Sequence, residues 1–284
     1  MEKISIKEIP NQVRNDKFVV SAIQMNSAIA DKRANFEKVQ KLVERDVDCN
    51  TDIIVLPEVW TVGWSPKNFQ ASAENLNNSE TVDFLSEIAK KYNSWVVGGS
   101  FITKDGEHFY NTCPVLNREG KLVTTYSKNH LFSYYGSDEG KYVEIGNSPV
   151  MVDIEGVKTG LTICYDIRFP EIYRAYRKAG ADLFINCAAW GLKKPIPWES
   201  MTRCRAVENQ TFMVALTQSG YIEDGEWNIG HSRIIDYKGD SACEIKDQKE
   251  GAMTASINLK EMYDFREKCT CMNDIRKTYE VKTV

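Results

Sequence analysis

Short apolar runs alternate along this chain with segments in which apolar residues recur every three or four positions. The runs predict buried strands at Phe18–Gln24, Asp52–Leu56, Ser94–Ile102, Val150–Ile154, Val157–Ile163, Asp182–Cys187, Phe212–Thr217, Ser232–Tyr237 and Gly251–Asn258. The helical spacing predicts helices at Asp31–Asp46, Thr81–Tyr92, Pro170–Ala179 and Pro197–Asn209. Phe109–Leu116 and Leu122–Tyr126 are typical of a hairpin, because a turn sequence joins them. Helices and strands alternate in both halves, so the predicted class is α/β.

The chain contains no stretch with the composition of a linker. We therefore expect a single domain over residues 18–284, preceded by a polar N-terminal arm at residues 1–17. Within the strand predicted at Ser94–Ile102, the pair Gly98-Gly99 indicates a close approach of another backbone segment.

Charge and composition exclude several classes of partner. Thirty-six basic and 40 acidic residues give a net charge of -4, which is not the balance of a strongly basic nucleic-acid binder. No apolar run approaches the roughly 18 residues that span a membrane, and the first residues lack the apolar core of a secretory signal. We therefore expect a cytoplasmic protein with neither a nucleic acid nor a membrane as partner.

The cysteines and histidines do not have the spacing of a metal site. The chain has eight cysteines and three histidines, and the only close cysteine pair, Cys269 and Cys271, has the spacing C-x-C. We expect most of these thiols to be reduced and buried, with no metal and no cofactor.

Three residues with reactive side chains each follow an apolar strand. Glu58 follows IIVLP, Lys128 follows LVTTYS and Cys164 follows GLTI. Ligands of α/β folds bind outside the carboxyl ends of strands, so a carboxylate, an ammonium group and a thiol are expected to meet there. Neither a phosphate-binding loop nor a G-x-S-x-G nucleophile motif is present.

This trio has the chemistry needed for acyl transfer through a thioester. A thiol with an ordinary pKa is only about 3% ionised at neutral pH, and a nearby carboxylate can accept its proton as substrate arrives. A lysine can stabilise the oxyanion that forms on the substrate carbonyl. The backbone N–H of Tyr165, which follows the nucleophile, is a second candidate donor.

Four segments around these residues resemble the motifs of the nitrilase, or carbon–nitrogen hydrolase, superfamily. They are LPE at Leu56–Glu58, KNHLF at Lys128–Phe132, CYDIRFPE at Cys164–Glu171 and RAVENQ at Arg205–Gln210. The resemblance implies an α-β-β-α four-layer sandwich in which Glu58 is the general base, Lys128 stabilises the oxyanion and Cys164 is the nucleophile. It also implies a second glutamate after the lysine motif. Glu139 fits best, and Glu144 is the alternative.

Within the superfamily, the chain is most similar to the ω-amidase-like branch. That similarity implies hydrolysis of the terminal amide of a small carboxylic monoamide, such as α-ketoglutaramate, by an enzyme that forms a homodimer or a higher homo-oligomer through helices near Pro170–Ala179 and the C-terminal tail. The segment Trp190–Trp198 departs from the family pattern and is expected to border the pocket. We name Trp60, Tyr165 and Trp190 as candidate substrate-binding residues, with a core role as the alternative for both tryptophans.

Other interpretations stay open at this point. The same cluster suits an N-carbamoyl-amine or N-carbamoyl-amino-acid amidohydrolase. Cys164 with His130 or His231 would make a different kind of thiol hydrolase, and a non-catalytic binding or regulatory homologue would keep the fold alone. For Asp166 and Arg168, we expect an ion pair that shapes the turn after Cys164. Lys193 and Lys194 are expected to be a solvated pair on a loop, with binding of a substrate carboxylate as the alternative.

Overall fold

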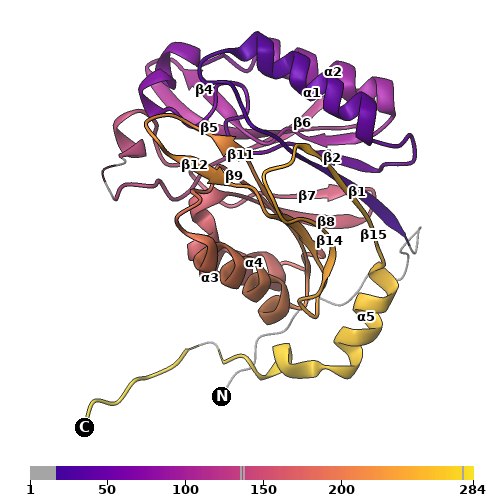
Figure 1. Ribbon diagram of the computed structural model, residues 1–284. Helices are drawn as coiled ribbons and strands as arrows, with labels where there is room; N and C mark the ends of the chain where they lie inside the picture. Colours follow the sequence, from indigo (N-terminus) through magenta and orange to yellow (C-terminus); the bar gives the residue numbers. More distant parts are fainter. Residues whose placement is uncertain (1–16, 135, 137, 277) are drawn as a thin grey trace.

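Two β-sheets lie face to face at the centre of the computed structural model, which describes residues 17–134, 136, 138–276 and 278–284. Helices α1 and α2 cover the outer face of the first sheet, and α3 and α4 cover the outer face of the second (Figure 1). This arrangement is the predicted α-β-β-α four-layer sandwich, and it confirms the α/β class. The predicted N-terminal arm at residues 1–17 falls almost entirely outside the described residues.

The first sheet has seven strands in the order β15-β1-β2-β3-β5-β4, with β6 paired to β5. Its strands are β1 (Phe18–Gln24), β2 (Ile53–Val55), β3 (Trp95–Val97), β4 (Phe101–Asp105), β5 (His108–Leu116), β6 (Leu122–Ser127) and β15 (Gly251–Ile257). The neighbours β1, β2 and β3 are parallel, and β3-β5 and β5-β6 are antiparallel pairs, so β6 runs in the direction of β2. The carboxyl ends of β2 and β6, which precede Glu58 and Lys128, therefore lie at one edge of this sheet.

The second sheet has six strands in the order β14-β13-β10-β9-β8-β7. Its strands are β7 (Met151–Ile154), β8 (Val157–Ile163), β9 (Leu183–Ala188), β10 (Phe212–Thr217), β13 (Ser232–Ile235) and β14 (Ser241–Ile245). A separate two-stranded ribbon consists of β11 (Ser219–Tyr221) and β12 (Trp227–Ile229). The parallel strands β9 and β10 are buried on both faces and consist almost entirely of apolar residues, whereas β8 also buries Thr159 and Thr162.

The helices begin and end where local hydrogen bonds favour it. They are α1 (Lys32–Asp46), α2 (Glu80–Tyr92), α3 (Pro170–Lys178), α4 (Pro195–Asn209) and α5 (Leu259–Lys268). Asp31 caps α1 by accepting a bond from the Ala34 N–H, and Ser79 caps α2 in the same way. No helix in the described part of the chain has the length and apolar character needed to cross a bilayer.

The core reflects these layers. Val39, Leu42 and Val43 of α1 pack with Ile23 and other outer-face residues of the first sheet. A second, larger cluster fills the space between the sheets and continues beneath α3 and α4. Burial of these apolar faces, rather than helix propensity, is what holds the layers together.

The strand predicted at Ser94–Ile102 is in fact two strands, β3 and β4, separated at Gly98-Gly99. Gly99 has φ +64°, and a Cβ atom there would lie 2.0 Å from the carbonyl oxygen of Pro57. The predicted close approach is thus confirmed, and the approaching segment is the one that carries Glu58. The elements α5, β11, β12 and β14 were not indicated by the sequence pattern, because β11 and β12 are only three residues long and α5 and β14 are only partly buried.

Candidate active site

Glu58 occupies a tight turn beyond the end of β2. Its neighbour Val59 has φ +41° and donates its N–H to Ser100 Oγ at 2.9 Å, which ties the turn to the segment after Gly99. The backbone carbonyl of Glu58 accepts a bond from Gln218 Nε2 at 2.6 Å. The Glu58 side chain is fully buried, so its carboxylate depends on the groups around it for hydrogen bonds.

Lys128 joins two buried carboxylates. Its Nζ donates to Glu58 Oε1 at 2.8 Å and to Glu139 Oε1 and Oε2 at 3.0 and 2.8 Å. Glu139 lies in the 3₁₀ turn η3 (Glu139–Lys141), and its Oε2 also accepts the N–H of Phe132 at 2.8 Å. The structure therefore brings Glu139 into the cluster. Glu144, the alternative, is half-exposed and pairs with His108 at 2.7 Å.

Sequence reasoning missed a fourth member of this cluster, Asn111 on β5. Its Nδ2 donates to Glu58 Oε1 at 3.0 Å and to Glu139 Oε1 at 3.2 Å. The side chain is completely buried. No local sequence pattern marks it, because its two carboxylate partners lie 53 and 28 residues away in the chain.

Cys164 is the first residue of the 3₁₀ turn η4 (Cys164–Arg168), directly after β8. Its φ of +46° is unusual for a residue other than glycine, so the backbone is strained at the thiol. Glu58 lies near enough to the thiol for its negative charge to act on the pKa of Cys164, and Glu58 Oε2 accepts the N–H of Ala189 at 2.8 Å. The two sheets thus each supply part of one site: Glu58 and Lys128 come from the first and Cys164 from the second.

The electrostatics of the cluster favour a neutral thiol at rest. Burial and the negative charge of Glu58 raise the pKa of Cys164 well above its ordinary value, against the opposing effect of Lys128. Burial also raises the pKa of Glu58; Lys128 opposes this and Glu139 adds to it. Burial alone would lower the pKa of Lys128, but the two carboxylates outweigh it and raise that pKa. The thiol is therefore protonated at rest, beside a carboxylate that is more basic than an ordinary one.

Asp166 links the lysine segment to the cysteine turn. It accepts bonds from the Tyr126 hydroxyl at 2.6 Å, from His130 Nδ1 at 2.7 Å and from the Ile163 N–H at 2.9 Å. The expected ion pair between Asp166 and Arg168 is thus wrong, because His130 takes the place of the arginine. Neither His130 nor His231 is among the described residues that line the pocket at Cys164, so the geometry gives no support to a Cys–His hydrolase.

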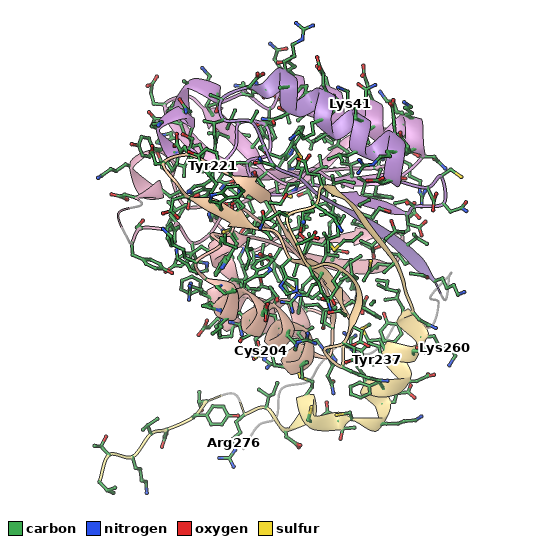
Figure 2. The ribbon with its side chains drawn as sticks, viewed as in Figure 1. Lys41, Cys204, Tyr221, Tyr237, Lys260 and Arg276 are labelled. Atoms are coloured by element: carbon green, nitrogen blue, oxygen red, sulfur yellow. The ribbon has the colours of Figure 1, made fainter. Side chains whose placement is uncertain are left out.

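A pocket of about 540 Å³ opens at Cys164. Its aromatic wall consists of Trp64, Phe132, Tyr134, Tyr165, Trp190 and Trp227. Trp227 belongs to the β11–β12 ribbon, which Tyr221 marks at the surface in Figure 2. Such a pocket is large enough to hold a ligand well beyond ten non-hydrogen atoms.

Of the predicted substrate-binding residues, Tyr165 and Trp190 line this pocket and Trp60 does not. Trp60 is fully buried on the opposite side of its sheet, where its ring packs near Phe36 and Phe84 and its Nε1 donates to the Gly98 carbonyl at 2.8 Å. The core alternative therefore holds for Trp60. Trp64, four residues further on, contributes to the pocket and lies beneath the Lys128 ammonium, 5.1 Å from it.

The pocket wall also carries positive charge, from Arg168, Lys193 and Lys194. Arg168 lies 5.3 Å from the Trp190 ring, and its buried Nε has no hydrogen-bond partner. Lys193 pairs with Glu226 of the ribbon, and burial lowers the pKa of Lys194 below its ordinary value, with Arg168 adding to the effect. Lys193 is largely exposed, as expected, and both lysines line the pocket, as predicted for the Trp190–Trp198 segment. Among the described residues, no group of three or more His, Cys, Asp or Glu side chains is placed to hold a metal.

The fold and the cluster together fit a hydrolase that acts on carbon–nitrogen bonds. Residues 19–267 match the family described as Carbon-nitrogen hydrolase, and the chain belongs to this family.

Relatives support this assignment over nearly the whole chain. A 2-oxoglutaramate amidase of Bacillus subtilis is 34% identical, covering 92% of this chain and 98% of the relative. An omega-amidase of Danio rerio is 30% identical, covering 94% and 98%. The crystal structure of Saccharomyces cerevisiae Nit3, described as a member of branch 10 of the nitrilase superfamily, superposes with a TM-score of 0.80 at 28% identity, covering 89% of this chain and 94% of that one.

Proposed function

We propose that this chain is an ω-amidase: a thiol amidohydrolase that cleaves the terminal amide of a small dicarboxylic monoamide, such as 2-oxoglutaramate, to the acid and ammonia. The observation that carries the proposal is the buried cluster of Glu58, Lys128, Glu139 and Cys164 at the end of an aromatic pocket with cations in its wall. The relatives named 2-oxoglutaramate amidase and omega-amidase support the choice of substrate.

In the proposed acylation, Glu58 accepts the thiol proton of Cys164 while Sγ attacks the amide carbonyl carbon. The carbonyl oxygen becomes an oxyanion, which Lys128 and the backbone N–H of Tyr165 stabilise. When the tetrahedral intermediate collapses, its carbon–nitrogen bond breaks. Glu58 returns the proton to the nitrogen, and ammonia leaves. An acyl-thioester on Cys164 remains.

In the proposed deacylation, Glu58 removes a proton from a water molecule, and the resulting hydroxide attacks the thioester carbonyl. A second oxyanion forms at the same donors. The carbon–sulfur bond then breaks, the proton passes from Glu58 to the sulfur, and the carboxylic acid product leaves. The role of Glu139 in both steps is to hold Lys128 in place through its two bonds to Nζ.

We propose Arg168 as the group that receives the free carboxylate of the substrate. Its guanidinium lies by the Tyr165 and Trp190 rings of the pocket wall, and among the described ion pairs no carboxylate neutralises its charge. Arginine binds carboxylates in a planar, two-point geometry. A substrate with one amide end at Cys164 and one carboxylate end at Arg168 would fill both needs.

Steady-state ammonia release from a panel of amides tests this function. The panel holds 2-oxoglutaramate, succinamate, butyramide, N-carbamoylputrescine and N-carbamoyl-β-alanine, with Cys164→Ala as the control. We expect turnover of the two carboxylate-bearing amides at a kcat/KM at least tenfold above that of butyramide. Carbon dioxide and ammonia from the carbamoyl compounds alone would instead establish the N-carbamoyl hydrolase. No turnover of any compound would contradict the proposal.

Arg168→Met sharpens this test. It should raise the KM for succinamate by about tenfold or more, equivalent to the ~1.5–3 kcal/mol of a hydrogen bond to a charged group, and should leave butyramide nearly unchanged. Arg33→Met is the matched control, because Arg33 is exposed on α1, pairs with Glu37 there and does not line the pocket. Equal losses for both substrates would assign Arg168 a structural role instead.

We also propose that the chain acts as a homodimer in the cytoplasm. The exposed Val207 on α4 supports a contact through the helices of the second sheet. Light scattering after size exclusion tests it: a mass of twice 32.4 kDa is expected, and a monomer at micromolar concentration would contradict it.

A further inference from the structure

We propose that Asn111 is a positioning residue of the catalytic cluster, whose amide keeps Glu58 and Glu139 in place while Lys128 turns an N–H toward the substrate oxyanion. The inference rests on the proposed roles of Glu58, Lys128 and Cys164. It assigns a function to Asn111, which is not among the described residues that line the pocket.

All three side-chain N–H donors of Lys128 are already in use. Lys128 has three N–H groups, and its three hydrogen bonds all go to carboxylate oxygens. To stabilise an oxyanion, Lys128 must redirect at least one of these donors. The carboxylate oxygen that loses it would then be left short of a hydrogen bond in a fully buried site, which is unfavourable.

Asn111 donates to two of the carboxylate oxygens that accept from Lys128. Glu58 Oε1 accepts from Lys128 and from Asn111, and so does Glu139 Oε1. When Lys128 redirects a donor from either oxygen, the amide of Asn111 is still bonded there. Because both neighbours are acceptors when ionised, the amide must present its NH₂ to them, which settles its orientation chemically.

The two ends of the Asn111 amide differ in their hydrogen bonding: Nδ2 donates to both carboxylates and Oδ1 has no partner. Asn111 Oδ1 is buried and has no hydrogen-bond partner, so this asparagine lowers stability at one end to serve two carboxylates at the other. Its own backbone is fixed, since its carbonyl accepts the N–H of Lys128 at 2.9 Å. Asn111 therefore binds the backbone N–H of Lys128 and also the two carboxylates, of Glu58 and Glu139, that accept from Lys128 Nζ.

The charge balance explains why a neutral donor suits this place. The titratable groups that face Glu58 are Lys128 from the end of β6, Glu139 from η3, Cys164 from η4 and Cys187 from β9. A second cation here would hold Glu58 in its ionised form and weaken it as a base, and a third carboxylate would favour its protonation. An amide donates to both carboxylates without adding charge.

The test uses Asn111→Ala and the isosteric Asn111→Asp, with Asn209→Ala as the matched control. Asn209 is equally buried, donates through Nδ2 to the Arg205 carbonyl at 3.0 Å and also has an unpartnered Oδ1, but it lies at the end of α4. We expect kcat to fall by about ten- to a hundredfold in both Asn111 variants, part of the roughly 10²–10⁴-fold that acid–base catalysis supplies. KM should change by less than about threefold, and the control should keep the wild-type kcat.

The pH profile separates positioning from a general loss of structure. Removing a donor from a carboxylate favours its protonated form, so the acidic limb of kcat/KM should move to higher pH, and further in Asn111→Asp than in Asn111→Ala. Wild-type kcat and an unmoved acidic limb in folded Asn111 variants would overturn the inference. So would a loss of activity with an unmoved limb.

Alkylation of Cys164 by iodoacetamide makes the test independent of the proposed substrate. The rate is followed on the Cys164 peptide by mass spectrometry, because the exposed thiols of Cys49, Cys204 and Cys271 are alkylated too, whereas Cys164 is buried. Figure 2 shows Cys204 on α4, far from the β11–β12 ribbon. We expect the acidic limb of alkylation to move as in turnover. If no amide is cleaved but this limb moves, the inference on Asn111 stands and the proposed function fails; if amides are cleaved and the limb stays, the reverse holds.

Discussion

Replacing Lys128 by methionine removes the only cation that touches two fully buried carboxylates among the described ion pairs. At 2.8 Å, with an effective dielectric constant of ~20, each unit pair attracts by about 6 kcal/mol. The two pairs give a gross attraction of about 12 kcal/mol, most of which offsets the desolvation of three charged groups. Removing one member of such a cluster lowers the free energy of unfolding by roughly 3–5 kcal/mol, and this is the expected loss near neutral pH.

The loss should depend on pH with a definite sign. The raised pKa of Lys128 means that its stabilisation is complete below the ordinary lysine pKa and is lost only as pH rises above it. In Lys128→Met, the carboxylate pair can relieve its repulsion only by binding a proton, so the variant gains stability as pH falls. The difference between wild type and variant should therefore shrink from about pH 8 to about pH 5.

Urea unfolding followed by circular dichroism at both pH values measures this difference. Lys91→Met is the control, because Lys91 forms an exposed ion pair with Glu44 at 2.7 Å, and it should change stability little at either pH. If Lys128→Met does not fold, Glu139→Gln added to it removes one of the two carboxylate charges and should restore folding. A loss below about 1 kcal/mol, or one that is the same at both pH values, would refute the reasoning.

Three further predictions concern the same turn and cluster. Glu139→Gln removes a negative charge that raises the pKa of Glu58, so the acidic limb of kcat/KM should move to lower pH; a shift to higher pH would contradict the assigned sign. Glu58→Gln should keep the fold by circular dichroism and lower the alkylation rate of Cys164 at least tenfold, and an unchanged rate would rule out Glu58 as the base. Gly99→Ala places a Cβ atom 2.0 Å from the Pro57 carbonyl oxygen. The free energy of unfolding, measured by thermal unfolding, should therefore fall by about 1–3 kcal/mol or more. A wild-type melting temperature would contradict the predicted clash.

Most helices and strands were predictable because their caps and their apolar positions lie within the element itself. The helix at Asp31–Asp46 was predicted within one residue, since an N-cap and one apolar face define it. The strand Phe18–Gln24 was predicted at its observed bounds, because a strand that is buried on both faces consists mostly of apolar residues. The strand at Ser94–Ile102 was divided by a tertiary contact between Gly99 and Pro57, which no local pattern contains.

The candidate site was predictable only as far as its motifs extend. Glu58, Lys128 and Cys164 follow strands and were placed correctly at one locus, since the ends of β2, β6 and β8 meet there. The direction in which a side chain points after a tight turn could not be predicted from the motifs. Trp60 turns into the core and Trp64 into the pocket, and the turn at Val59 has a backbone conformation that periodicity cannot anticipate.

Pairings between distant residues were the least predictable part. Asp166 was expected to pair with its near neighbour in sequence, but it binds His130, 36 residues away. Asn111 was missed because an asparagine in a strand carries no local sign of two buried carboxylates. Such partners come from the register of β5 against its neighbours and from the packing of one sheet on the other.

The central claim is that Cys164 carries the acyl group after ammonia has left. Rapid quenching of the enzyme with 2-oxoglutaramate, followed by mass spectrometry of the Cys164 peptide and parallel assay of ammonia, tests it most directly. The account predicts an adduct with the mass of the substrate minus ammonia on Cys164, formed with a burst of one ammonia per site, and neither signal in Cys164→Ala. Turnover of 2-oxoglutaramate by Cys164→Ala, or an adduct on another residue, would contradict the account.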